Sequence, residues 1–289
     1  MSKLSKYIKR GIKYMLHGQP VVQVKPRIAT LSRNELLQGR TALITGGTSG
    51  IGKAIAEAFM NAGANVIITS RTAERAEKAA AELWEKCPTQ SAMGIAMDNT
   101  DVESIKDAFA ELTEKSPVID ILVNNAGIGE AVWGATTETE YDKVMDTNLK
   151  GVFFLTEYVA RYMKEHDIHG NILNICSSSS VRPVNTAYKL SKWALKGFTM
   201  GLAKTLIKYD IVVNGIAPGP TATPLYGMDN VDDIAKNDNP NGRFTLPEEI
   251  ANMAVIYVSD MGRTIVGDIA YMTGGAGNLT FDDNQEYSL

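Results

Sequence analysis

Cysteine is scarce in this chain, and the scarcity narrows the kinds of protein that it can be. The 289 residues include two cysteines, Cys87 and Cys176, too few for a disulfide framework. No CxxC pair and no cluster of cysteine and histidine has the spacing of metal ligands. We therefore expect a protein of the reducing cytoplasm that holds no metal.

Long apolar runs are also missing. No run approaches the roughly 20 residues that a membrane-spanning helix needs, so the sequence predicts no integral membrane protein. Hydrophobic residues make up 44% of the chain and charged residues 21%, which is ordinary for a globular enzyme. The formal net charge of -4 argues against nucleic acid as a general partner.

Acidic residues are absent from the first 34 positions, which carry eight Lys or Arg. Within residues 1–16, apolar positions recur near helical spacing among five of these cations, which predicts a basic amphipathic helix. Such a helix could contact an anionic membrane surface, at the inner face of the membrane, or an acidic partner. It could equally pack on its own catalytic domain or on another subunit. We expect residues 1–38 to be an extension and residues 39–289 a single catalytic domain.

From Thr41 onward, short apolar runs alternate with helical patterns. This alternation is typical of an α/β protein with a doubly wound parallel sheet, a Rossmann fold of about seven strands covered by helices on both faces. The predicted strands are 42–44, 65–69, 91–97, 119–123, 171–176, 211–216 and 268–272. The predicted helices are 53–59, 72–85, 101–115, 138–165, 186–208 and 247–259.

A glycine-rich turn lies between the first predicted strand and its helix, with the pattern TGxxxGxG and glycines at 46, 50 and 52. Glycine lets a diphosphate approach the backbone, and the free N–H groups at a helix start attract its negative charge. A structural turn could have the same composition, so the pattern alone does not decide for a cofactor. The residues predicted to hold a dinucleotide here are Gly46, Thr48, Ser49, Gly50, Ile51 and Gly52.

Polar residues follow the third and fourth predicted strands. Asp98 and Asn99 end the third, and the NNAG segment with Asn125 and Gly127 follows the fourth. All of them fall on the carboxyl edge of the sheet, where doubly wound folds bind ligands. Asp and Asn also cap strands and turns, which is the competing interpretation.

The end of the second strand indicates which dinucleotide fits. An acidic residue there would hydrogen-bond a free ribose 2′-hydroxyl, whereas a cation would accommodate a 2′-phosphate. This chain has Ser70 followed by Arg71, which favours NADP(H), with NAD(H) as the second option. The alternative is that Arg71 is an exposed residue at the start of a helix.

Tyr188 and Lys192 are four residues apart on a predicted helix, so they share one face. A free tyrosine titrates near about 10, and a neighbouring ammonium group favours the phenolate. The pair is typical of a tyrosine that transfers a proton, assisted by the lysine. A tyrosine and a lysine four residues apart also occur by chance in many helices, so the spacing alone does not decide.

In their order and spacing, TGxxxGxG, NNAG and YxxxK resemble the compact, single-domain form of the short-chain dehydrogenase/reductase family, over about residues 39–277. The resemblance implies an enzyme that interconverts a ketone and a secondary alcohol, and a homotetramer. It implies that Asp98, Asn99 and Asn125 hold the adenine and ribose. It also implies that Pro218 and Thr223 lie over the nicotinamide, where Thr223 binds the carboxamide.

The same resemblance implies a catalytic tetrad of Asn148, Ser177, Tyr188 and Lys192, in which Tyr188 and Lys192 also contact the cofactor. Ser177 is chosen because it lies three residues after Asn174. The 11 residues from Ser177 to Tyr188 are two fewer than the family spacing, so Ser178 stays an alternative. Asn148 is expected to interrupt its helix and to hold a water that links Lys192 to solvent.

The predicted substrate lid, residues 224–242, is polar and acidic with few large apolar groups. It favours a small polar substrate, or a carbonyl of the sugar or 3-oxoacyl type, over a steroid. The competing function is a sensor or scaffold that binds a dinucleotide without turnover.

Overall fold

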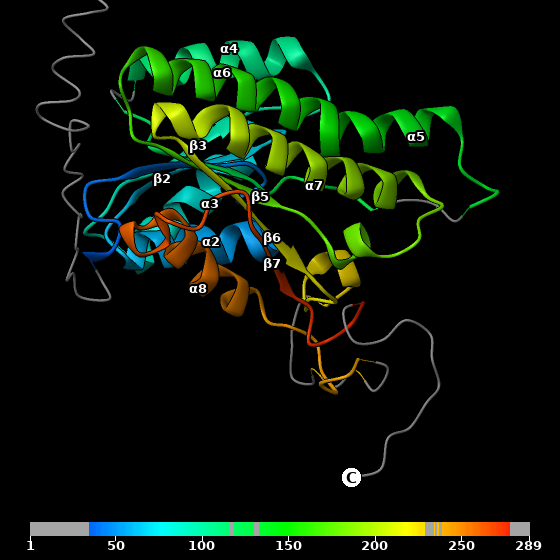
Figure 1. Cartoon of the computed structure of the whole chain (residues 1–289). Coiled ribbons are helices and arrows are strands. Elements are labelled where there is room, and N and C mark those ends of the chain that lie inside the picture. Colours follow the sequence, from blue (N-terminus) through cyan, green and yellow to red (C-terminus); the bar gives the residue numbers. More distant parts are fainter. Residues whose placement is uncertain are drawn as a thin grey trace, which may run out of the picture. The chain divides into compact units, whose positions relative to one another are not determined.

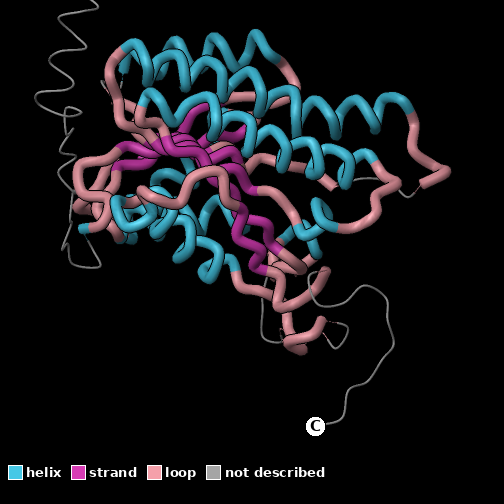
Figure 2. The backbone as a smooth tube through the Cα atoms, viewed as in Figure 1, coloured by secondary structure: helices cyan, strands magenta, loops and turns pink. Residues whose placement is uncertain are grey.

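A parallel sheet of seven strands runs through the part of the chain that the computed structural model describes, which is residues 35–115, 118–129, 133–228, 234, 236 and 239–277. The strand order is β3-β2-β1-β4-β5-β6-β7. Figure 2 shows the strands enclosed by helices on both sides. The strands are β1 (Thr41–Ile44), β2 (Asn65–Ser70), β3 (Ala92–Ala96), β4 (Ile121–Asn124), β5 (Asn171–Ile175), β6 (Val212–Pro218) and β7 (Ile269–Met272). The predicted doubly wound fold is confirmed.

Seven α-helices are described, and they divide between the two faces of the sheet. Helices α4, α6 and α7 cover one face, and α2, α3 and α8 cover the other (Figure 1). The helices are α2 (Gly50–Asn61), α3 (Ala73–Lys86), α4 (Val102–Lys115), α5 (Glu138–Met145), α6 (Gly151–Glu165), α7 (Ala187–Leu206) and α8 (Pro247–Val258). All of them fall within or close to the predicted helical segments.

The five inner strands β2, β1, β4, β5 and β6 bury both of their faces, which explains why they are short continuous apolar runs, whereas the edge strand β3 is partly exposed. In β1, Leu43 faces the core under α4, α6 and α7, and Ile44 faces the core over α2, α3 and α8. In β2, Ile67 lies in the same core as Leu43, and Ile68 lies in the same core as Ile44. These inner strands thus join two apolar cores, and their packing fixes the strand register.

Residues 1–34, including the predicted basic helix at 1–16, lie outside the described part of the chain. The described chain starts at Glu35. Leu37 is already buried in the core, and its N–H donates to Ala62 O at 2.8 Å. The boundary between extension and catalytic domain stays a prediction.

Two helices have local features near the predicted site residues. Thr72 lies at the N-cap position of α3, but its side chain makes no capping hydrogen bond. The predicted helix 138–165 contains a π-helical turn, η2 (Asp146–Lys150), between α5 and α6.

Among the described residues, no helix has both the length and the apolar character to cross a membrane.

Strands β1 and β4 are neighbours in the sheet although two strands separate them in sequence. From β1 to β3 the successive strands are added toward one edge of the sheet, and from β4 to β7 toward the other. Loops after β1 and β4 leave toward opposite sides and open a crevice at the carboxyl edge. The candidate site lies at this point.

Candidate active site

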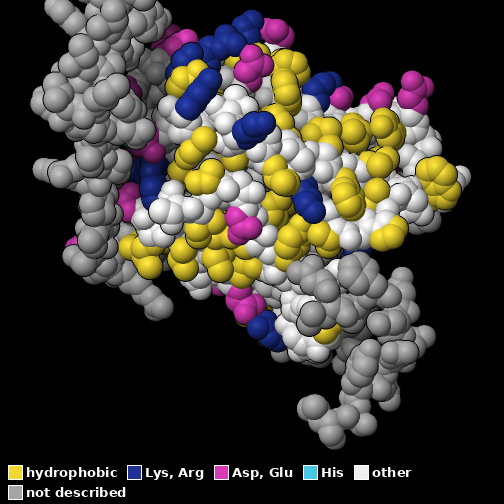
Figure 3. Space-filling model, viewed as in Figure 1, with side chains coloured by type: hydrophobic (Ala, Val, Ile, Leu, Met, Phe, Trp, Pro, Cys, Tyr) yellow, Lys and Arg dark blue, Asp and Glu magenta, His cyan; other side chains and the backbone are white. Residues whose placement is uncertain are grey.

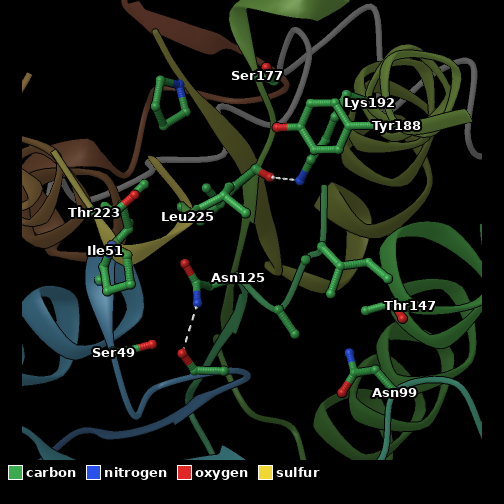
Figure 4. A pocket seen from close by; sticks show the side chains of 18 of the residues that line it. Ser49, Ile51, Asn99, Asn125, Thr147, Ser177, Tyr188, Lys192, Thr223 and Leu225 are labelled. Atoms are coloured by element: carbon green, nitrogen blue, oxygen red, sulfur yellow. Dashed lines mark hydrogen bonds between the residues drawn. The ribbon is translucent and has the colours of Figure 1, made fainter. Parts of the chain in front are cut away.

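A cleft of about 830 Å³ lies at the carboxyl edge of the sheet, within the size range of small-molecule and cofactor sites. Figure 4 shows Ser49, Ile51 and Thr223 on one side of it and Tyr188 and Lys192 on the other. The predicted residues that line it are Gly46, Thr48, Ser49, Gly50, Ile51, Ser70, Arg71, Asp98, Asn99, Asn125, Gly127, Ser177, Tyr188, Lys192, Pro218 and Thr223. Gly52 and Asn148, which were also predicted, do not line it but pack directly behind its wall.

The glycine turn has the backbone that a diphosphate site requires. Gly46 has φ +65° and Gly50 has φ +52°, a conformation that strains any residue with a side chain. Ser49 caps α2 in an extended conformation, and its side chain makes no capping hydrogen bond. The first N–H groups of α2 have no partner within the helix, so they and the Ser49 hydroxyl are available to an anion.

Gly52 has a packing role. A Cβ at this position would lie 2.4 Å from Asn125 Nδ2 and 2.5 Å from Gly46 O. The absence of a side chain lets α2 start close against the segment after β4, which brings the helix start to the cleft.

Asn125 braces the glycine turn. Its Nδ2 donates to Thr45 O at 2.9 Å and to Gly46 O at 3.2 Å (Figure 4). In return, Thr45 Oγ1 accepts from the N–H groups of Asn125 and Ala126, both at 3.0 Å. The Asn125 side chain therefore positions the turn, in addition to lining the cleft.

The end of the cleft beside β2 contains two exposed cations, Arg71 and Arg75. Sequence reasoning found Arg71, which directly follows β2, but missed Arg75, which lies in the first turn of α3. Asp98 Oδ1 accepts from both the N–H and the hydroxyl of Thr100 at 2.9 Å, so this carboxylate also forms a turn. Asn99 is 5% exposed, and its Nδ2 has no hydrogen-bond partner.

Lys192 is the charged group at the centre of the cleft. It is 5% exposed, and its Nζ donates to Ile175 O at 2.8 Å (Figure 4). Burial lowers the pKa of Lys192. Nζ lies 5.8 Å from the centre of the Tyr188 ring, one turn earlier on α7.

Burial raises the pKa of the neighbouring Cys176 thiol to about 11, so that thiol stays protonated at neutral pH and is a poor nucleophile.

Asn148 lies in the π-helical turn and is fully buried. Its Oδ1 accepts from Ile128 N at 2.9 Å, and its Nδ2 donates to Ile128 O at 3.1 Å and to Ser191 Oγ at 3.3 Å. A Cβ at Gly127 would lie 3.5 Å from Asn148 Oδ1 and 3.7 Å from Lys192 Nζ. The helix is thus interrupted where predicted, and Asn148 and Lys192 lie behind the same glycine.

Three of the four consecutive serines, Ser177 to Ser179, line the cleft. Ser177 Oγ accepts from Ser179 N at 3.1 Å, while the fully buried Ser180 donates to Ser177 O at 2.7 Å. Figure 4 shows the Tyr188 hydroxyl directed toward the end of the cleft where Ser177 lies. Because Ser177 and Ser178 are similarly buried, burial does not choose between them.

Thr223 borders the cleft at the start of the predicted lid. It is 6% exposed, and its hydroxyl donates to Thr221 O at 3.3 Å. Leu225, which also lines the cleft, is 60% exposed. Much of the remaining lid lies outside the described residues.

Sequence reasoning also missed Arg182, which lines the cleft. The other omissions are the charged residues of α5 and η2 that line the opposite wall, Asp142, Lys143 and Asp146. Their i, i+3 and i+4 spacing places them on one helical face, but nothing in the sequence shows that this face borders the cleft.

The chain is similar to known oxidoreductases along most of its length. The family model described as short chain dehydrogenase matches residues 40–233. A 3-oxoacyl-[acyl-carrier-protein] reductase of Aquifex aeolicus is 37% identical over 246 residues, which cover 83% of this chain and 98% of the relative. The gluconate 5-dehydrogenase of Burkholderia cenocepacia, solved with NADP and tartrate, has a TM-score of 0.76 at 33% identity, covering 84% of this chain and 97% of the other. A 3-ketoacyl-(acyl-carrier-protein) reductase of Brucella melitensis, solved with NADH, has a TM-score of 0.75 at 29% identity, covering 83% and 99%.

Proposed function

The chain belongs to the short-chain dehydrogenase/reductase family of oxidoreductases, and from this premise we propose that it interconverts a ketone and a secondary alcohol with NADP(H) as the preferred cofactor. The observation that carries the proposal is the buried Lys192 beside Tyr188 on the wall of a cleft that also contains Ser177. The substrate is proposed to be small and polar, or a sugar-type or 3-oxoacyl carbonyl.

The residues of the cleft fit a dinucleotide. The glycine turn and the start of α2 would hold the diphosphate, and Ser70 and Arg71 would hold the ribose with its 2′-phosphate. The unpartnered Nδ2 of Asn99 is a donor for the adenosine, and Thr223 would bind the carboxamide. The bound cofactor supplies or accepts the hydride.

The chain's own residues orient the substrate and move the proton. We propose that the Tyr188 hydroxyl exchanges a proton with the substrate oxygen, which Ser177 holds by a hydrogen bond. The positive charge of Lys192 stabilises the phenolate form of Tyr188. Asn148 positions the segment around Ile128 and connects Lys192 to the proton supply.

A panel of ketones and alcohols, assayed with NADPH and NADP⁺ and then with NADH and NAD⁺, tests the function. We expect turnover of at least one polar carbonyl of the sugar or 3-oxoacyl type, faster with NADPH. Tight dinucleotide binding with no turnover across the panel would contradict the proposal and favour the sensor or scaffold. The proximity of Tyr188, Lys192 and Ser177 argues against that alternative, because a sensor has no need of all three.

We further propose a homotetramer in which α6 and α7 contact a second copy of the chain. Large hydrophobic side chains are exposed along these two helices, and Figure 3 shows them on that face. Phe153 is 46% exposed and stacks on Phe198 with ring centres 5.3 Å apart. Exposed apolar side chains that gather on one face are typical of an interface.

Phe153→Glu should therefore convert the tetramer into a smaller species, because it places a charge in the centre of an apolar contact. Light scattering coupled to size exclusion measures the mass. Trp84→Glu is the matched control, since Trp84 is 53% exposed on α3 at the opposite face of the sheet. Equal masses for Phe153→Glu and wild type would place the interface elsewhere.

A further inference from the structure

Arg182 is held by its backbone at the substrate end of the cleft. It ends the short 3₁₀ helix η3 (Ser178–Val181), and its N–H donates to Ser179 O at 3.3 Å. Its carbonyl accepts from Trp193 Nε1 at 2.8 Å, which ties it to α7. It lines the cleft together with Tyr188. Two elements that carry the proposed catalytic residues therefore fix its place.

The guanidinium group of Arg182 has no anionic partner among the residues that the structure describes. Its Nε is buried and makes no hydrogen bond. A Cβ at Gly277 would lie 2.4 Å from Nε and 2.9 Å from Nη2, so the group packs against bare backbone. Unsatisfied buried donors are rare in proteins, and each one calls for an explanation such as a water, an ion or a ligand.

The other described arginines divide by location. Those away from the cleft are each paired with a carboxylate, namely Arg40 with Asp120, Arg161 with Glu157, Arg243 with Glu249 and Arg263 with Asp210. Arg71, Arg75 and Arg182 line the cleft, and among the described residues none of them forms an ion pair. The unpaired arginines are thus those that a ligand can reach.

Arg182 cannot serve the same anion as Arg71 and Arg75. Those two follow β2, whereas Arg182 lies in the segment after β5, three strand spacings away in the sheet. Strands lie about 4.8 Å apart, so the carboxyl ends of β2 and β5 are separated by roughly 14 Å. We therefore assign Arg182 to a different anion from the 2′-phosphate proposed for Arg71.

We propose that Arg182 binds a carboxylate of the substrate, so that the enzyme acts on hydroxy acids and the matching keto acids. This inference rests on the proposed function and assigns its substrate class. Guanidinium matches a carboxylate because its planar N–H donors can bond both oxygens at once. Ser177 and Tyr188 would hold the reacting oxygen of the substrate, and Arg182 would hold its carboxylate. These two contacts set the orientation of the substrate's carbon chain in the cleft.

The test compares molecules that differ only in the carboxylate. Isothermal titration of the NADP⁺-loaded protein with L-tartrate and L-threitol measures binding, and initial rates with D-gluconate and D-glucitol measure turnover. In the wild type the acid should bind at least about tenfold more tightly than the neutral compound, as a charge-assisted hydrogen bond implies. Arg182→Gln should bring the ratio to about one, and Arg182→Lys should retain part of it.

Lys86→Gln is the matched control, because it removes a positive charge from an exposed side chain of α3, outside the cleft and away from the proposed interface of α6 and α7, and should leave the ratio unchanged. A ratio that is the same in wild type and Arg182→Gln, or no binding of L-tartrate by the wild type at about 10 mM, would overturn the proposal. Removing residues 278–289, which include Asp282, Asp283 and Glu286, should also leave the ratio unchanged. A preference that appears only after this removal would mean that the chain's own end is the partner of Arg182.

Different results would refute the proposed oxidoreductase activity and the proposed carboxylate site. Turnover of neutral ketones with a ratio that does not depend on Arg182 would keep the oxidoreductase and refute the carboxylate site. Tartrate binding that depends on Arg182, with no turnover of any compound, would keep the anion site and refute the oxidoreductase.

Discussion

Tyr188→Phe should lower kcat by about 10²- to 10⁴-fold, the usual contribution of a positioned acid or base, while cofactor affinity changes little. The substitution removes one oxygen and keeps the ring. The ring centre lies 5.8 Å from the Lys192 ammonium, and Lys192 keeps its hydrogen bond to Ile175 O. Stopped-flow rates and equilibrium titration with NADPH separate the two quantities. A variant that retains more than about a tenth of the wild-type kcat would rule out Tyr188 as the proton donor.

The serine assignment is tested in the same assay with a matched pair. Ser177→Ala should cost about 10²- to 10³-fold in kcat, the size expected for one hydrogen bond to the developing oxyanion. Ser178→Ala should cost less than about tenfold, although the two side chains are 7% and 8% exposed and so equally buried. A larger loss at Ser178 would reverse the assignment. Unchanged thermal midpoints for both variants exclude misfolding as the cause.

The parts of the site that follow directly from regular structure were predictable from the sequence. The glycine turn, the polar residues after β3 and β4, and the Tyr188 to Lys192 spacing each depend on one element and its immediate neighbour. Their positions at one edge of the sheet follow from the parallel topology, since all carboxyl ends of the strands meet there. The π-helical turn at Asn148 was expected only through the family resemblance.

Other parts depend on contacts between segments that are distant in sequence. The bracing of the glycine turn by Asn125 joins residues about 80 positions apart, and no local pattern predicts it. Arg182 was not predicted as a site residue, because its importance comes from the absence of a carboxylate partner among the residues that the structure describes. Such an absence cannot be read from the sequence, since it depends on which side chains the fold brings near the guanidinium group.

Arg75 was missed because the sequence argument considered only the residues at the end of β2. The residue that directly follows this strand is Arg71. Arg75 lies in the first turn of α3 and lines the same cleft, so a second cation is present at this end of it. Two cations instead of one strengthen the case for a 2′-phosphate.

Cofactor preference should be strong and reversible by substitution. A hydrogen bond from guanidinium to phosphate is worth about 1.5 to 3 kcal/mol, so each contact corresponds to roughly 10- to 150-fold in affinity. NADPH should therefore outcompete NADH in the wild type, and Arg75→Gln should reduce that advantage without removing it. Lys86→Gln serves again as the control for a lost surface charge.

Ser70→Asp should reverse the preference instead of weakening both cofactors. Ser70 ends β2 and lines the cleft beside Arg71, so a carboxylate there repels a 2′-phosphate and accepts a hydrogen bond from a free 2′-hydroxyl. The same carboxylate would pair with Arg71 and Arg75, which withdraws both cations from the phosphate. The ratio of kcat/KM for NADPH and NADH, measured on wild type and Ser70→Asp with one substrate, decides the matter. If the wild type already prefers NADH, Arg71 and Arg75 are solvated residues before and in the first turn of α3, and the argument from charge at this end of the cleft is wrong.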